Sequence, residues 1–343
     1  MKAKSKVTIR NNRSQMIPAF IVAFAVAGIG IKLLLGSHAA TPSTAAGEAE
    51  SGTKAGTTSV VADTSASGGN ALQFGTVASG GGGTSPSGQA MPTGNLTMSN
   101  SLGSHTYTPI FKDDFTVDAA TGSWGTSDAG AILYKNSSNN NAGWYEYPDG
   151  WSATYTNGAV GYEPSQVLSV HDGQLDFYLH TWNGHPVGAN PSPNAGTSGN
   201  YQTYGAYSFR IKVSNTMSDF YSAWLLWPQD ESKWCQAESD FPEANLGSLN
   251  GFSVFAHNQC NSSGGNGGQD YFGSSTNMAA WHTYTETWGP GYRSYYVDGS
   301  LIGTSTTNVY NNLERWQLQT EPSGSSSGSS GHIYVDWAVV YKY

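Results

Sequence analysis

Three carboxylates lie close together in the segment Glu238-Ser239-Asp240-Phe241-Pro242-Glu243. Side chains alternate between the two faces of a strand, so Glu238 and Asp240 share a face and Glu243 would point to the other. One extra residue in a β-bulge restores the parity of Glu243, and strand prolines such as Pro242 collect at bulges and edges. The spacing therefore predicts that the three acids converge on one face of a bulged strand.

Converging carboxylates could perform acid–base chemistry. Carboxylates that share a weakly polar cleft repel one another, which raises at least one pKa and keeps that group protonated near neutrality. An ionised carboxylate beside a protonated one is the pair that a retaining glycosidase uses, with the two carboxyl groups about 5–5.5 Å apart. A solvated acidic edge or a calcium loop would also explain the pattern, so the neighbouring segments must decide.

The elements that must position these acids are predicted to be short strands. The dipeptides Asp172-Gly173 and Asp298-Gly299 are hairpin signals, and no segment shows a helical period with caps. Many short strands with Gly-rich turns over residues 105–343 predict an all-β sandwich of the jelly-roll type. The alternating segments are Gln174–His180, Ala206–Val213, Phe252–His257, His282–Trp288, Ser294–Val297 and Ile333–Val340.

The chain before this domain has a different texture. Residues 1–36 join a basic segment to the apolar run of residues 16–36, which predicts an export signal or a membrane anchor, and we favour a retained apolar helix. Residues 37–104 are rich in Ser, Thr and Gly and are expected to be a disordered linker. Within them, residues 47–74 resemble the opening of a carbohydrate-binding module, over too short a stretch for a whole module. The rest of the chain would lie at the cell surface, anchored or secreted.

Composition restricts the partners. The chain has 15 basic and 24 acidic residues, and six of the basic ones precede residue 37, which leaves 9 against 24. Such an acidic surface repels phosphate backbones, so we expect no nucleic acid as partner. Charged residues make up only 11% of the chain, while Trp and Tyr number 11 and 20, which favours an extracellular all-β protein that binds a weakly charged polysaccharide as a monomer. Cys235 and Cys260 are either a disulfide or two buried thiols.

The surroundings of the acids closely resemble glycoside hydrolase family 16, the laminarinase and lichenase group, over most of residues 110–343. The resemblance begins with the segment Trp224-Leu225-Leu226-Trp227-Pro228 and the acidic stretch Trp234–Glu243. Five further segments look like successive strands of that family, in the same order along the chain. They are Val167–Leu175, Tyr204–Lys212, Trp281–Trp288, Tyr295–Gly299 and Val335–Trp337.

The resemblance implies a concanavalin A-like jelly-roll sandwich whose concave sheet forms an open cleft. It also implies that Glu238 is the nucleophile, Asp240 its helper and Glu243 the general acid/base. No cofactor is required for this chemistry. The remaining roles implied are Arg210 and Trp224 in the sugar-binding cleft, His257 near the acids, and Asp336 at a structural calcium site.

This sequence departs from the family pattern at a few positions. Ser239 stands where the family usually has an aliphatic residue, and Ala237 stands in place of Gly. Ser208 stands where relatives often carry Glu, on the same face as Arg210, so the substrate preference is open. All three acids are present, so activity is expected.

The sequence therefore predicts an extracellular hydrolase that cleaves internal O-glycosidic bonds of a β-linked polysaccharide by retaining double displacement, with 1,3-linked glucan as one candidate. A transglycosylase would use the same residues with a sugar as acceptor in place of water. A surface adhesin or lectin would use the same sandwich without turnover.

Overall fold

The computed structural model describes residues 58–62, 70–74, 85–124, 134–140, 142–154, 160–195, 200–324 and 326–343. The apolar helix expected within residues 1–36 lies outside these ranges. Among the residues described, no helix is long and apolar enough to cross a membrane. Strands β1 (Thr58–Ala62) and β2 (Asn70–Phe74) pair with each other as a separate two-stranded sheet.

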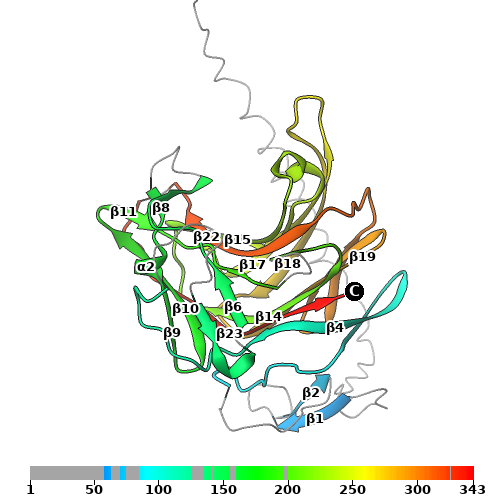
Figure 1. Cartoon of the computed structure of the whole chain (residues 1–343), viewed down its shortest axis with the longest axis horizontal. Helices are drawn as coiled ribbons and strands as arrows, with labels where there is room; N and C mark the ends of the chain where they lie inside the picture. Colours follow the sequence, from blue (N-terminus) through cyan, green and yellow to red (C-terminus); the bar gives the residue numbers. More distant parts are fainter. Residues whose placement is uncertain are drawn as a thin grey trace, which may run out of the picture. The chain divides into compact units, whose positions relative to one another are not determined.

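From residue 85 onward the chain is built almost entirely from strands (Figure 1). One sheet has ten strands, and its main path is β11-β10-β23-β14-β19-β20-β21. The bounds of these strands are β11 His185–Val187, β10 Gln174–Trp182, β23 Gly331–Lys342, β14 Gly205–Val213, β19 His282–Gly289, β20 Tyr292–Val297 and β21 Ser300–Ser305. The remaining three members are β3 Leu96–Asn100, β4 Gly103–Asp113 and β9 Leu168–His171.

A second sheet has six strands in the order β13-β22-β15-β16-β17-β18. Their bounds are β13 Tyr201–Gln202, β22 Glu314–Pro322, β15 Phe220–Pro228, β16 Ser239–Asn245, β17 Asn250–Cys260 and β18 Asn266–Asn277. Short elements fill the connections, namely β5 Tyr134–Asn136, β6 Ala142–Tyr145, β7 Trp151–Ser152, β8 Val160–Tyr162, β12 Ser192–Pro193, α2 Pro164–Val167, η3 Ser137–Asn139 and η5 Glu231–Gln236.

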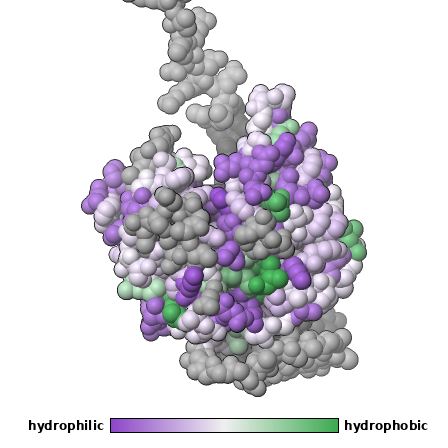
Figure 2. Space-filling view, viewed as in Figure 1, coloured by the Kyte–Doolittle hydropathy of each residue, from purple (hydrophilic) through white to green (hydrophobic). Residues whose placement is uncertain are grey.

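The two large sheets pack face to face around one aromatic core, so the expected all-β sandwich is confirmed. Alternate residues of each strand face inward, as the period of two requires. Phe209 of β14, for example, packs against Trp224 of β15 with ring centroids 4.9 Å apart. Burial of each such side chain stabilises the fold by roughly 1.5–3 kcal/mol. The face of the molecule seen in Figure 2 is mostly hydrophilic or intermediate, with small hydrophobic patches.

The predicted hairpin turns are present where the sequence placed them. Asp172 and Gly173 have φ values of 53° and 72°, and Asp298 and Gly299 have values of 48° and 78°. Positive φ at both central positions is the geometry that Asp-Gly favours in two-residue hairpins. Strand β18 was not among the predicted segments, because its Gly and Asn residues have low β-propensity and only its pairing with β17 makes it a strand.

The folded part begins earlier than the expected boundary at residue 105. Strands β3 and β4 form a hairpin, and Ser85 donates a hydrogen bond of 2.5 Å to Asp336 of β23. The linker expectation is therefore wrong for residues 85–104, where Ser85 and Ser87 donate hydrogen bonds to Asp336 and Leu96–Asn100 form a strand. Residues 37–84 are described only at β1 and β2.

Candidate active site

A β-bulge in β16 brings Glu243 to the same face as Asp240. Asp240 pairs with Leu225 of β15 and Phe255 of β17, whereas Glu243 pairs with Ala223 and Ser253. The two acids are thus three residues apart on β16 but only two apart on each neighbouring strand. The extra residue lies in the Phe241-Pro242 step, as the sequence predicted, and Phe241 and Ala244 point into the core.

Glu238 immediately precedes β16 and is fixed from both sides through its backbone. Its N–H donates to the Trp234 carbonyl at 2.8 Å, and its carbonyl accepts from the His257 N–H at 2.9 Å. A disulfide between Cys235 and Cys260 joins the end of η5 to the end of β17. Of the two alternatives for the cysteines, the structure therefore has the bridge, and it encloses the acidic segment.

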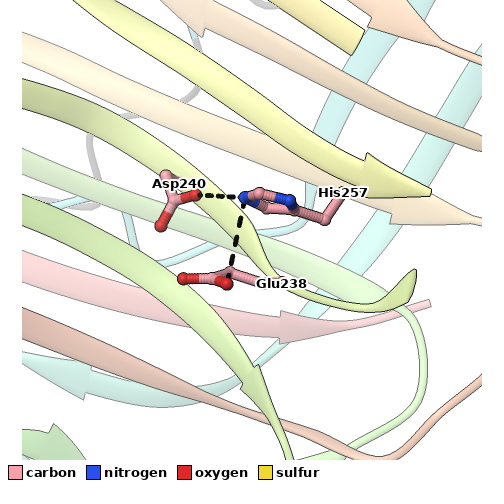
Figure 3. A group of neighbouring side chains, drawn as sticks. All are labelled: Glu238, Asp240 and His257. Carbon is pink, nitrogen blue, oxygen red and sulfur yellow. Dashed lines mark ion pairs between the residues drawn. The ribbon is translucent and has the colours of Figure 1, made fainter. Parts of the chain in front are cut away.

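His257 lies between two of the acids (Figure 3). Its Nε2 is 3.5 Å from Asp240 Oδ2 and 3.9 Å from Glu238 Oε2. The Asp240 side chain is 4% exposed and that of Glu238 is 17% exposed, so the site is open to solvent at Glu238. On the far side of the bulge, the Tyr221 hydroxyl donates a hydrogen bond to Glu243 Oε1.

All three acids hold protons more tightly than free carboxyls do. Burial, followed by the charge of Asp240, raises the pKa of Glu238 to about 9. Burial, followed by the charge of Glu286, raises the pKa of Asp240 to about 8. Burial raises the pKa of Glu243 to about 7. Because Glu238 and Asp240 share a hydrogen bond, the protons belong to the pair, which retains at least one at neutral pH.

Among the residues that the structure describes, Glu238, Asp240 and His257 form the group that could hold a metal ion. Each offers one ligand atom, and these atoms lie within 4.8 Å of one another. Asp336, the residue expected at a calcium site, is not in this group. It is buried on the ten-stranded sheet, where Ser85 and Ser87 donate hydrogen bonds to its Oδ2.

Two expected substrate contacts are not part of this site. The Trp224 side chain is fully buried and packs against Phe177 and Phe209 in the core, so the preference for Trp224 over Trp227 as the cleft residue is wrong. The expectation that Arg210 lies in the sugar-binding cleft is also wrong. Arg210 lies on β14 in the ten-stranded sheet, where its Nε donates to Ser87 at 2.6 Å and its NH1 donates to Thr283 at 3.2 Å.

A polar pocket on the six-stranded sheet escaped the sequence analysis. Leu225 pairs with Asp240 on one side and with Gln317 of β22 on the other, so Gln317 lies about 10 Å from Asp240, two strand spacings away. Asn190 is buried in this pocket, and its Nδ2 and Oδ1 have no hydrogen-bond partner among the residues that the structure describes. The lining residues are Tyr145, Glu146, Tyr147, Asn190, Ser192, Asn200, Arg315 and Gln317.

The pocket also has an aromatic rim and a cation. Arg315 donates hydrogen bonds of 2.7 Å to the hydroxyls of Tyr201 and Tyr147. The Tyr147 ring stacks on Trp151 with centroids 5.4 Å apart, and Trp151 is 47% exposed. The only sequence signal for this pocket is the alternation of polar residues in β22, because the other lining residues come from distant parts of the chain.

The sequence of this chain is similar to those of known proteins. A family model described as glycosyl hydrolases family 16 matches residues 149–338, more than half of the chain. A β-glucanase from Paenibacillus polymyxa is 27% identical over 197 residues, which are 53% of this chain and 72% of that protein.

Two solved structures share the fold. LamA from Z. galactanivorans, crystallised with laminaritriose and laminaritetraose, is 16% identical with a TM-score of 0.50, and the match covers 68% of this chain and 99% of that one. SCLam, a non-specific endo-β-1,3(4)-glucanase, is 15% identical with a TM-score of 0.50, and the match covers 73% of this chain and 95% of that one.

Proposed function

The chain belongs to glycosyl hydrolases family 16 and is therefore a glycosidase, and we propose that it cleaves internal bonds of a β-linked glucan with retention of configuration. The observation that carries this proposal is the bulge in β16, which gives Glu243 the same orientation as Asp240. β-Bulges are over-represented next to active sites, where they re-aim a side chain.

In the proposed mechanism Glu238 attacks the anomeric carbon while Glu243 donates its proton to the leaving oxygen. The covalent glycosyl-enzyme is then hydrolysed by a water whose proton Glu243 takes up, which restores both groups. Burial raises the pKa of both paired acids, and that of Glu238 more, but a nucleophile must be ionised, so in the attacking state the mechanism requires the shared proton to lie on Asp240. Glu238 is then ionised, with His257 beside both acids.

We further propose that the polar pocket binds sugar residues of the substrate. The amide of Asn190 offers a donor and an acceptor that have no partner in the described part of the chain. A hydroxyl group, which both donates and accepts, suits this combination. The exposed face of Trp151 offers a surface for a pyranose ring. LamA was crystallised with laminaritriose and laminaritetraose, and SCLam is an endo-β-1,3(4)-glucanase. Both support a glucan with 1,3-linkages as the first substrate to test.

Product release from defined polymers tests the proposal. The purified chain would be incubated with laminarin, mixed-linkage β-glucan, galactan and xyloglucan beside Glu243→Gln. We expect short oligosaccharides of several sizes early in the digestion of one glucan, none with the variant, and β-anomers first by proton NMR. α-Anomers appearing first would refute double displacement, and folded protein that releases nothing from either glucan would refute the substrate class. Longer products from added acceptors would indicate transglycosylation.

A further inference from the structure

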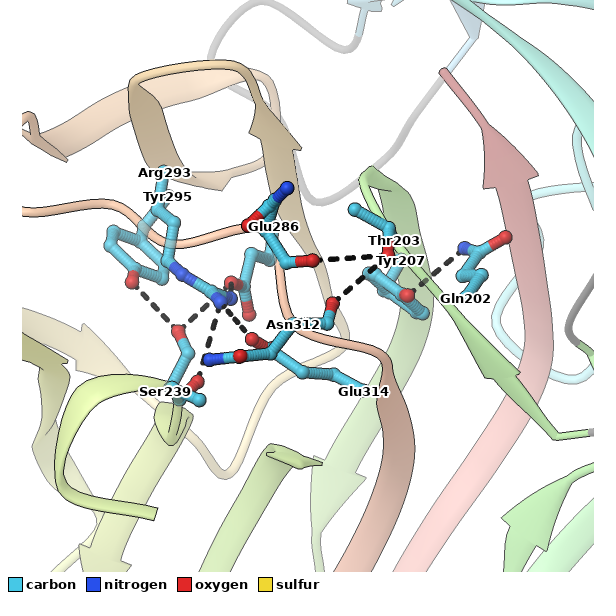
Figure 4. A network of polar contacts seen from close by, with 11 residues as sticks. Gln202, Thr203, Tyr207, Ser239, Glu286, Arg293, Tyr295, Asn312 and Glu314 are labelled. Carbon is cyan, nitrogen blue, oxygen red and sulfur yellow. Dashed lines mark hydrogen bonds and ion pairs between the residues drawn. The ribbon is translucent and has the colours of Figure 1, made fainter. Parts of the chain in front are cut away.

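Three charged side chains are buried between the two sheets, directly behind the catalytic strand (Figure 4). Arg293 of β20 donates to Glu286 of β19 at 3.1 Å and to Glu314 of β22 at 2.6 Å. Their side chains are 4%, 5% and 0% exposed respectively. Two carboxylates and one guanidinium leave an excess of negative charge in the interior when both acids are ionised.

This network holds both residues that flank Glu238. The hydroxyl of Ser239 donates to Glu286 Oε1 at 2.8 Å and lies 2.7 Å from the Tyr295 hydroxyl. Arg293 NH2 donates to the carbonyl oxygen of Ala237 at 3.3 Å. The backbone on each side of Glu238 is therefore fixed from the interior, while the Glu238 side chain faces the solvent side.

Stability alone does not account for such a network. Taking charges out of water costs free energy that their mutual attraction only partly offsets, and well-packed apolar residues of similar volume are often as stable. Ser239 is the link to the acidic strand, and it stands where the resembling family usually has an aliphatic residue that could not donate to Glu286. The link between the interior carboxylate and the catalytic strand thus depends on the Ser239 hydroxyl.

We propose that Glu286, held by Ser239 and Arg293, is a positioning residue for the reaction, which fixes the backbone at Glu238. This inference rests on the proposed function of the acids. Glu286 touches no substrate and acts only through the strand.

The backbone bonds of Glu238 itself complete this arrangement. Its N–H donates to the Trp234 carbonyl at 2.8 Å, and its carbonyl accepts from the His257 N–H at 2.9 Å. Glu238 is thus held by η5 and β17, while the interior network holds Ala237 and Ser239 on either side of it.

The test is Glu286→Gln, which preserves shape and leaves Arg293 paired with Glu314. A neutral amide accepts more weakly from Ser239 and Arg293 than a carboxylate does, so it holds the backbone beside Glu238 less firmly. We expect kcat to fall several-fold while KM stays unchanged, because the residues that line the polar pocket are not part of the network. Glu321→Gln, another buried acid, bonded to Thr154 and Tyr162, is the matched control.

Amide hydrogen exchange at Glu238 and His257, followed by NMR, separates this inference from the proposed function, because it needs no turnover. Faster exchange in Glu286→Gln on a protein that cleaves no glucan would support the network and refute the function. Turnover with both kcat and the exchange rates unchanged would overturn the network. If Glu286→Gln does not fold, Ser239→Ala decides: it keeps every charge and should lower kcat several-fold with KM unchanged, and an unchanged kcat would overturn the inference.

Discussion

Removal of the Cys235–Cys260 bridge should affect both stability and turnover, because all three acids and His257 lie in the loop that it closes. The perturbation is the double variant Cys235→Ser with Cys260→Ser, compared with the oxidised protein. Loss of the bridge frees the unfolded chain and also releases the end of η5, which leads directly into Glu238.

The size of the stability effect follows from the length of the loop. The two cysteines are 25 positions apart, and closing a loop of that length lowers the entropy of the unfolded chain by an amount worth about 3.5 kcal/mol at 25 °C. For a folded unit of this size, each kcal/mol shifts Tm by about 2–4 °C. The double variant should therefore melt roughly 7–14 °C below the oxidised protein.

Two assays follow the two consequences. Urea unfolding monitored by tryptophan fluorescence gives the loss of free energy, and glucan hydrolysis at a temperature where both proteins are folded gives kcat. We expect kcat to fall while KM changes little, because the polar pocket lies outside the loop. An unchanged unfolding midpoint would refute the entropic reasoning, and an unchanged kcat would show that the backbone bonds of Glu238 suffice to place it.

Further predictions concern single side chains. Glu243→Gln should lower kcat about 10²–10⁴-fold, because the amide cannot transfer the proton; thermal unfolding checks that the variant is folded. For wild type, the pKa of about 7 for Glu243 means that the acid loses its proton above that pH, so kcat/KM should fall as the pH rises beyond 7, and a flat alkaline profile would contradict the role. Trp224→Ala should cost about 3–5 kcal/mol of unfolding free energy without raising KM, whereas Trp227→Ala should raise KM at little cost in stability. Asn190→Ala should raise KM for the glucan several-fold and leave kcat nearly unchanged; equal KM values would remove the pocket from the substrate path.

The bulge in β16 and the Asp-Gly turns could be predicted from the sequence, because each depends only on residues adjacent in the chain. The parity of Glu238, Asp240 and Glu243, together with Pro242, was enough to place the bulge, and the Asp-Gly turns needed only their own φ preferences. Such features are decided by the geometry of a few consecutive residues.

The errors arose where pairing between distant strands decides the outcome. Alternation shows that Trp224 and Trp227 face opposite ways, but only the position of the second sheet shows which face is the core. Arg210 was assigned to the cleft although β14 pairs with β19 and β23 in the other sheet. The pocket around Asn190 joins segments separated by more than a hundred residues, so no sequence window contains it.

The acids, the histidine and both cysteines all lie between residues 235 and 260, so the chemistry of the site is inherited as one uninterrupted stretch of the gene. The pocket, by contrast, is assembled from three separate stretches. Recombination between two relatives could therefore exchange the catalytic hairpin complete with its bulge and its bridge, while the recipient retains its own preference for a polymer. Chimeras built at these two boundaries would separate the inheritance of chemistry from that of specificity.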